Sequence, residues 1–111
     1  IFRGTPKAFQ QDPMALTLAQ TLIDMPDEYH SLDPSLQKWA LMPYMHSESP
    51  LIHEEGLRLF TELGDSVSLE FEIMHKEIID RFGRYPHRNT TLGRESSAEE
   101  LAFLEEPNSS F

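Results

Sequence analysis

The chain contains 111 residues, of which 39% are hydrophobic and 25% are charged, and its net charge is −10. This hydrophobic fraction is too high for a disordered chain, and the length suits one globular domain with its own core. The acidic balance works against binding to nucleic acid or to anionic membrane surfaces. There is no cysteine, so disulfides and thiolate metal ligands are excluded and a reducing cytoplasm is the expected location. No apolar run approaches the ~20 residues of a membrane-spanning helix.

Three helix starts are marked by a polar residue followed by proline, at Asp12-Pro13, Asp33-Pro34 and Ser49-Pro50. The polar residue caps the helix, and proline suits the first helical position because no N–H is needed there. The first helix is predicted to end before Met25-Pro26, since the residue before a proline avoids helical angles. The second helix is predicted to kink at Pro43 or to end near Met42, because an internal proline removes a helical hydrogen bond.

Apolar residues recur three or four positions apart after each of these starts, and again from residue 67. The predicted stripes are Met14, Leu18 and Leu22; Leu36, Trp39, Ala40, Pro43 and Tyr44; Ile52, Gly56, Leu59, Phe60 and Leu63; and Val67, Phe71, Met74, Ile78 and Phe82. This spacing brings each set to one helix face, so we expect the stripes to form the core. Gly64 and Gly83 follow the third and fourth stripes and predict left-handed helix ends.

A capping box from Ser97 to Glu100 predicts a fifth, short helix that carries Phe103 and stops at Pro107. No segment alternates with the period of two that a half-buried strand requires, so no sheet is expected. The sequence therefore predicts a single all-α domain of four or five helices, packed as antiparallel pairs in a tetratricopeptide-like array. The tetratricopeptide consensus itself is not met, so this expectation concerns architecture alone.

The loop of residues 84–96 is the basic part of an acidic chain. Five of the nine Lys and Arg residues lie in residues 75–94 beside only two acids, so this window has a charge of +3 against −13 elsewhere. One interpretation is an anion-binding pocket, for which the candidates are Arg84, His87, Arg88, Asn89 and Arg94. The other, which we favour, is a structural clip in which the arginines pair with carboxylates on the helices. Nucleic-acid binding is rejected, since only one aromatic residue, Tyr85, is interleaved with the basic residues.

The segment His46-Ser47-Glu48 follows the proline of the second helix and is a second candidate site. His46 and Glu48 could act as acid and base, although such polar residues also serve as helix caps. No metal site is expected, because HExxH is absent and zinc needs three or four ligands of defined geometry. His75 lies on the apolar face of the fourth helix, where we expect a hydrogen-bonded core histidine.

Four segments resemble the bacterial DUF924 family: IFRGTPKAF at residues 1–9, PYMHSE at 43–48, HKEIIDRFGRYPHRNTTLGRES at 75–96 and EELAFL at 99–104. They follow one another in order over nearly the whole chain. The resemblance implies a cytoplasmic, bacterial, helical, tetratricopeptide-like protein of unknown function. It also implies that residues 1–111 are the C-terminal part of a longer family domain, and it assigns no catalytic residue.

Two functions remain open. The first is a non-enzymatic helical module that binds a protein or peptide, favoured by the lack of a recognised catalytic motif. Its acidic surface would favour a basic partner. The second is a binding protein or enzyme for a small anionic ligand, in which the loop arginines neutralise charge while His46 or His87 acts with Glu48. This requires the loop to fold across the end of the second helix, and we expect no cofactor.

Overall fold

The protein is described by a computed structural model over residues 12–107 and Ser109, and the segment IFRGTPKAF lies outside this range. The described residues contain no strand, which confirms the all-α prediction. Their elements are α2 (Asp12–Ile23), α3 (Pro26–His30), α4 (Pro34–Met45), α5 (Pro50–Leu63), α6 (Ser66–Phe82), the 3₁₀ turn η1 (Pro86–Arg88) and α7 (Ala98–Leu104). These are six α-helices where four or five were expected, because the short α3 fills the connection after the first one.

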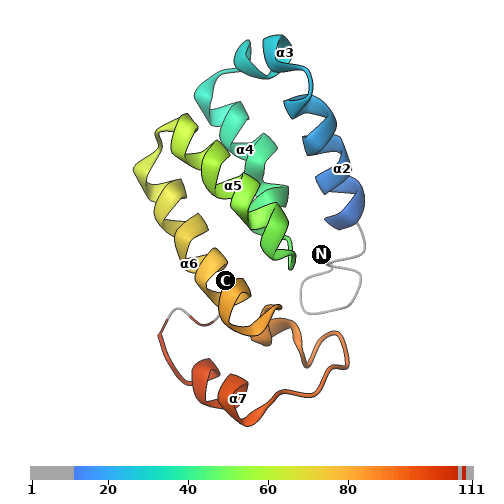
Figure 1. The fold of residues 1–111 in the computed structure, drawn as a ribbon, viewed down its shortest axis with the longest axis vertical. Helices are drawn as coiled ribbons and strands as arrows, with labels where there is room; N and C mark the ends of the chain where they lie inside the picture. Colours follow the sequence, from blue (N-terminus) through green and yellow to red (C-terminus); the bar gives the residue numbers. More distant parts are fainter. Residues whose placement is uncertain (1–11, 108, 110–111) are drawn as a thin grey trace.

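The long helices pack alongside one another, and α4 contacts α2, α5 and α6 (Figure 1). α2 packs against α4, α4 against α5, and α5 against α6, while α7 and the loop before it lie at the end of α6. Short turns join successive helices, so each returns alongside the one before. Among residues 12–107 no helix is both long and apolar enough to cross a lipid bilayer.

Local capping explains several of these helix ends, but the predicted cap at Asp33 is wrong, because its side chain makes no capping hydrogen bond at the start of α4. The Ser49 side chain accepts a hydrogen bond from the Ile52 N–H at the start of α5, as predicted. Gly64 and Gly83 adopt left-handed angles, with φ of 80° and 72°, and end α5 and α6 as expected. Ser97 forms the predicted capping box at the start of α7.

Of the two alternatives predicted at Pro43, a kink or a helix end near Met42, the second is wrong. The helix does not end near Met42 but continues through Pro43 to Met45, and the His46 N–H bonds to the Met42 carbonyl. An internal proline removes only one helical hydrogen bond. We attribute the continuation to tertiary packing, because the last turn carries Tyr44 and Met45, both of which are buried.

The buried apolar residues form two clusters. The larger one lies among α2 to α5 and contains Ala19, Tyr29, Leu41, Tyr44, Met45, Leu59 and Phe60. The smaller one joins α6 to the loop and α7 and contains Ile78, Ile79, Tyr85 and Phe103. The loop therefore contributes to the core through Tyr85, and the segment after α6 is anchored by packing as well as by charge.

Several residues predicted to be core are exposed instead. They are Met14, Leu18, Leu36, Trp39, Val67 and Phe71, with Trp39 at 70% and Val67 at 56% exposure. On α6 the buried face is displaced by one residue from the predicted stripe and carries Ser68, Glu72, His75 and Ile79, together with Ile78. Burial of the polar side chains is possible because each has a hydrogen-bonding partner, so the apolar spacing alone indicated the wrong face.

Gly56 allows α5 to approach its neighbours closely. A Cβ atom at this position would lie 3.1 Å from the Cβ of Tyr44 and 3.5 Å from Oε2 of Glu72. The absence of a side chain thus leaves room for the buried carboxyl group of Glu72 between α5 and α6.

Candidate functional site

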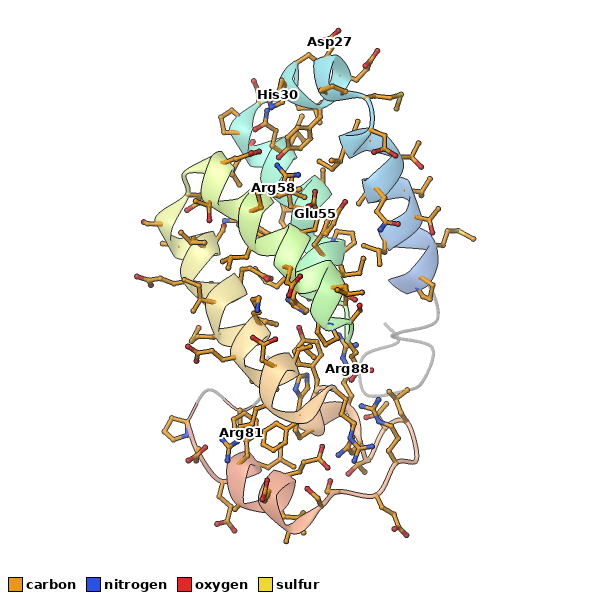
Figure 2. All side chains as sticks on the ribbon, in the orientation of Figure 1. Asp27, His30, Glu55, Arg58, Arg81 and Arg88 are labelled. Atoms are coloured by element: carbon orange, nitrogen blue, oxygen red, sulfur yellow. The ribbon has the colours of Figure 1, made fainter. Side chains whose placement is uncertain are left out.

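The loop after α6 folds against the end of α4 and the start of α5, as the small-ligand hypothesis required. Arg94 contacts Glu48, and Arg88 donates from Nη2 to the His46 carbonyl over 3.0 Å. Figure 2 shows Arg88 where the loop meets the helical layer, whereas Arg81 points toward α7. Two candidate segments 40 residues apart in sequence therefore share one site.

Glu48 and Arg94 form the principal joint between the loop and the helices. The two guanidinium Nη atoms of Arg94 each donate to one carboxylate oxygen of Glu48, both over 3.0 Å. The Tyr85 N–H also donates to Glu48 over 2.7 Å. Burial disfavours the charged carboxylate, but the hydrogen bonds from Arg94 and Tyr85 outweigh it and lower the pKa of Glu48. Arg94 is further held by the Asn89 side chain, which accepts from its Nε over 3.0 Å.

A second joint connects the loop to α7. Arg84 donates to both oxygens of Glu100, over 2.9 Å and 2.7 Å, and to the backbone carbonyl of Glu95. The hydrogen bond from Arg84 is the main cause that lowers the pKa of Glu100 to about 2. Arg84 and Arg94 thus make the contacts that the clip interpretation predicts, each with a carboxylate of its own chain.

Four of the five histidines gather around Tyr85, and this cluster was not predicted. The ring centroids of His53, His75 and His87 lie 6.1, 5.6 and 5.7 Å from that of Tyr85, and His46 lies 6.3 Å from His75. His75 is buried and its Nδ1 bonds to the Phe71 carbonyl over 2.6 Å, as expected of a core histidine. Among the residues described, no three His, Asp or Glu side chains are grouped so as to hold a metal ion.

The centre of this cluster is a buried chain of hydrogen bonds from α6 through α5 to the loop. His53 Nε2 lies 2.6 Å from the Ser47 carbonyl and must donate there, because a carbonyl only accepts. Its Nδ1 lies 2.8 Å from Oε2 of Glu72, and both side chains are fully buried. The Tyr85 hydroxyl lies 2.9 Å from Nε2 and donates to the Met45 carbonyl.

A single proton lies between His53 and Glu72, so the pair has no net charge wherever that proton resides. Burial raises the pKa of Glu72, although the hydrogen bond to His53 opposes the change. No sequence motif pairs His53 with Glu72. Gly56, one turn after His53, is the sequence feature that could have indicated the close contact between α5 and α6.

A cleft of about 400 Å³ opens beside this cluster, between the start of α2, the end of α4 and the loop. It is lined by Pro13, Leu16, Pro43, His46, Ser47, Glu48, Arg88 and Leu92. The cleft therefore includes His46, Glu48 and Arg88 from the predicted site. Arg88 is 8% exposed, and its guanidinium carbon lies 4.8 Å from the centroid of the Tyr85 ring.

Comparison with known proteins gives a family and one solved fold. A family model described as a bacterial protein of unknown function, DUF924, matches residues 1–108. A solved structure titled a protein of unknown function, ATU0120, from Agrobacterium tumefaciens is similar with a TM-score of 0.87 and 32% sequence identity. The similarity covers 95% of this chain and 58% of the length of that chain. No curated protein matches the chain.

The joint between Arg94 and Glu48 predicts a loss of stability when the cation is removed. We expect Arg94→Met to lower the free energy of unfolding by about 1–3 kcal/mol, because the half-buried Glu48 would lose its counter-charge and the two hydrogen bonds from Arg94. The matched control is Arg58→Met, since Arg58 pairs with Glu55 and Glu62 on the exposed face of α5 (Figure 2). That change should cost less than about 0.5 kcal/mol. Urea unfolding followed by circular dichroism measures both, and equal losses would contradict the clip.

The buried His75 predicts a loss of stability on acidification. Burial is the main cause that lowers the pKa of His75 from 6.5 to about 4. The unfolded chain therefore takes up this proton at a higher pH than the folded chain does. The free energy of unfolding should fall by roughly 3 kcal/mol through this residue as the pH decreases from 6.5 to 4, at ~1.36 kcal/mol per pKa unit.

Two variants isolate this effect in urea titrations at several pH values. His75→Phe should reduce the pH dependence of the free energy of unfolding between pH 6.5 and 4 by the amount expected for one proton, because phenylalanine does not titrate. His30→Phe, which replaces an exposed histidine of α3, should keep the wild-type dependence. A His75→Phe protein with the wild-type slope would show that another group takes up the proton.

Proposed function

This chain belongs to the DUF924 family of bacterial proteins of unknown function, and from its own geometry we propose that it binds a small anionic molecule. The binding site is the cleft between α2, the end of α4 and the loop. The observation that carries the proposal is the buried guanidinium of Arg88 in the wall of this cleft. A cation held in surroundings of low dielectric attracts an anion far more strongly than one in water.

The other loop arginines, Arg84 and Arg94, do not line the cleft. Arg84 and Arg94 each donate two hydrogen bonds to a carboxylate of the same chain, and Arg94 also bonds to Asn89. Arg88 is oriented by the His46 carbonyl and by the face of Tyr85, and these contacts hold it against the cleft. Of the five candidate loop residues, Arg88 is the one that lines the cleft, so we place the anion site there.

The dimensions of the cleft suit a small molecule. Its volume of about 400 Å³ lies in the range of ~300–1,000 Å³ typical of ligand pockets. His46 lines the cleft and is exposed, so it can exchange a proton with a bound molecule, whereas Glu48 is committed to Arg94. We assign binding and no reaction, and we propose that it occurs in the bacterial cytoplasm.

Melting experiments with a panel of anions test this proposal. Benzoate, succinate, phosphate and a nucleotide would each be added to the wild type and to Arg88→Gln. At 100 times its Kd a ligand stabilises by about 2.7 kcal/mol, so one member should raise the wild-type Tm by several degrees. Arg88→Gln should abolish this rise. Arg81→Gln, which changes a cation beside α7 outside the cleft, should retain it.

A second variant guards against the case in which Arg88→Gln merely destabilises the fold. Leu92→Trp keeps every charge and should block binding by filling the cleft, while Leu101→Trp on the exposed face of α7 should leave binding unchanged. The ligand-induced change in Tm is compared within each variant. A wild type that responds to no anion of the panel would overturn the proposal.

A second candidate function, binding of a basic protein or peptide, is favoured by the exposed apolar side chains. Leu36, Trp39, Val67 and Phe71 are between 45% and 70% exposed on α4 and α6. An exposed tryptophan is frequent among residues that dominate protein interfaces. The net charge of −10 would attract a basic partner.

Trp39 is the only tryptophan, so its fluorescence reports directly on this surface. A basic amphipathic helical peptide should shift the emission to shorter wavelength, because the indole would leave water. A peptide of equal composition with its apolar residues scrambled should not. Identical spectra with and without the amphipathic peptide would exclude this mode of binding at Trp39.

A further inference from the structure

We propose that one face of α6 is a docking surface for a basic amphipathic helix of a partner protein. The surface consists of Val67, Phe71, Met74 and Ile78 and of the pocket that α6 forms with α7. This inference goes beyond the functions proposed above, because none of these residues lines the anion cleft. It shares Val67 and Phe71 with the second candidate function but places the partner along α6 instead of at Trp39.

The apolar stripe of α6 is covered by the rest of the chain at one end only. Its four residues recur three or four positions apart and therefore share one face of the helix. Phe103 of α7 lies in one apolar cluster with Ile78 at the C-terminal end. Val67 and Phe71 are 56% and 45% exposed, because α5 packs against another face of α6. Figure 1 shows α6 at an edge of the molecule, with α7 near its C-terminal end. An exposed apolar row of this kind is typical of an interaction surface.

A pocket of about 350 Å³ lies where the stripe meets α7. Its apolar lining comes from Met74 and Ile78 of α6 and from Phe103 and Pro107. A side chain inserted here would gain about 25 cal/mol for each Å² of apolar surface that it covers. Large anchor residues in such pockets dominate the energy of many protein interfaces. The pocket thus provides a place for one large apolar side chain of the partner.

The shape of the surface favours a helical partner. From Val67 to Ile78 the row extends about 16 Å, since a helix rises ~1.5 Å per residue. About three turns of a second helix have the same length, and apolar residues at every third or fourth position of that helix can meet the row. An extended peptide binds instead by pairing with the edge of a sheet, and residues 12–107 contain no strand.

The charges beside the stripe favour a basic partner. Glu70 and Glu77 are exposed three positions after Val67 and Met74, so they flank the row, and Glu106 lines the pocket. The pocket lining also contains Arg81, but the three carboxylates outnumber this cation. Carboxylates steer a basic partner to the surface. A second copy of this chain would bring a net charge of −10, so repulsion opposes self-association through this face.

Binding of a labelled peptide tests the surface. The probe is a fluorescein-labelled peptide of about 18 residues, long enough to form a helix, with leucines three and four positions apart and lysines between them. One control peptide has the same composition in scrambled order, and another has glutamate in place of lysine. Fluorescence anisotropy with the full chain measures the affinity at about 0.15 M salt. The basic amphipathic peptide should bind at least about tenfold more tightly than either control, since only it matches both the apolar row and the carboxylates.

Substitutions of exposed apolar residues locate the peptide. Phe71→Ser should weaken its binding at least about tenfold, because the aromatic ring is removed from the middle of the row. The side chain is exposed, so the fold should be retained, which circular dichroism checks. Leu18→Ser is the matched control and should leave the affinity unchanged, since Leu18 is exposed on α2, which lies on the other side of α4 and α5 (Figure 1).

Charge variants separate the local carboxylates from the overall charge. Glu70→Lys combined with Glu77→Lys should weaken the basic peptide at least about tenfold. Asp27→Lys combined with Glu28→Lys changes the net charge by the same amount on α3, at the opposite end of the molecule from α7 (Figure 2), and should weaken it much less. Equal losses in the two double variants would show that binding follows net charge alone and would overturn the inference.

The remaining outcomes distinguish other occupants and the second candidate function. Loss of binding in Trp39→Ser with full binding by Phe71→Ser would place the peptide on α4, so that the second candidate function stands and this inference fails. Sedimentation of the chain alone should show a monomer. A dimer that Phe71→Ser dissociates would show that a second copy occupies the surface, and the basic partner would then be wrong. Absence of binding by the basic amphipathic peptide would overturn the inference outright.

Discussion

The position of the loop depends on one carboxylate, that of Glu48. It accepts hydrogen bonds from both Nη atoms of Arg94 and from the Tyr85 N–H, and so joins segments 46 residues apart. Through this joint Tyr85 enters the core and Arg88 reaches the cleft wall. The same carboxylate also lines the cleft, so the interaction that holds the loop contributes to the electrostatics of the candidate site.

Beneath this joint the interface between α5 and α6 is polar where a helical array usually has apolar contacts. His53, Glu72 and Tyr85 are almost completely buried, and their hydrogen bonds offset the cost of removing them from water. The pair of His53 and Glu72 carries no net charge, which avoids the larger cost of a buried ion. Because hydrogen bonds depend on direction, the network sets the relative position of α5, α6 and the loop more narrowly than apolar packing would.

The residues of the site therefore fall into two groups, those that only join parts of the structure and those that also line the cleft. Arg84, Arg94 and Asn89 belong to the first group, since their partners lie within the chain. Arg88 and His46 belong to the second, because both line the cleft. Both the family and the similar structure from Agrobacterium tumefaciens are described as of unknown function, so the chemistry of the cleft is the basis for our functional proposals.

The sequence by itself determined where α5, α6 and α7 end or begin, since the caps at Ser49, Gly64, Gly83 and Ser97 act on neighbours within four residues. It also indicated that the basic loop would meet carboxylates, because charge is readable without a fold. The buried face of α6 was decided only by the tertiary structure. Apolar spacing favoured Phe71, yet Glu72 is buried because a histidine 19 residues away supplies its hydrogen bond. No local pattern contains that partner. For the same reason the cleft, which joins α2, the end of α4 and the loop, and the histidine cluster, which also includes α5 and α6, are formed only by the tertiary structure.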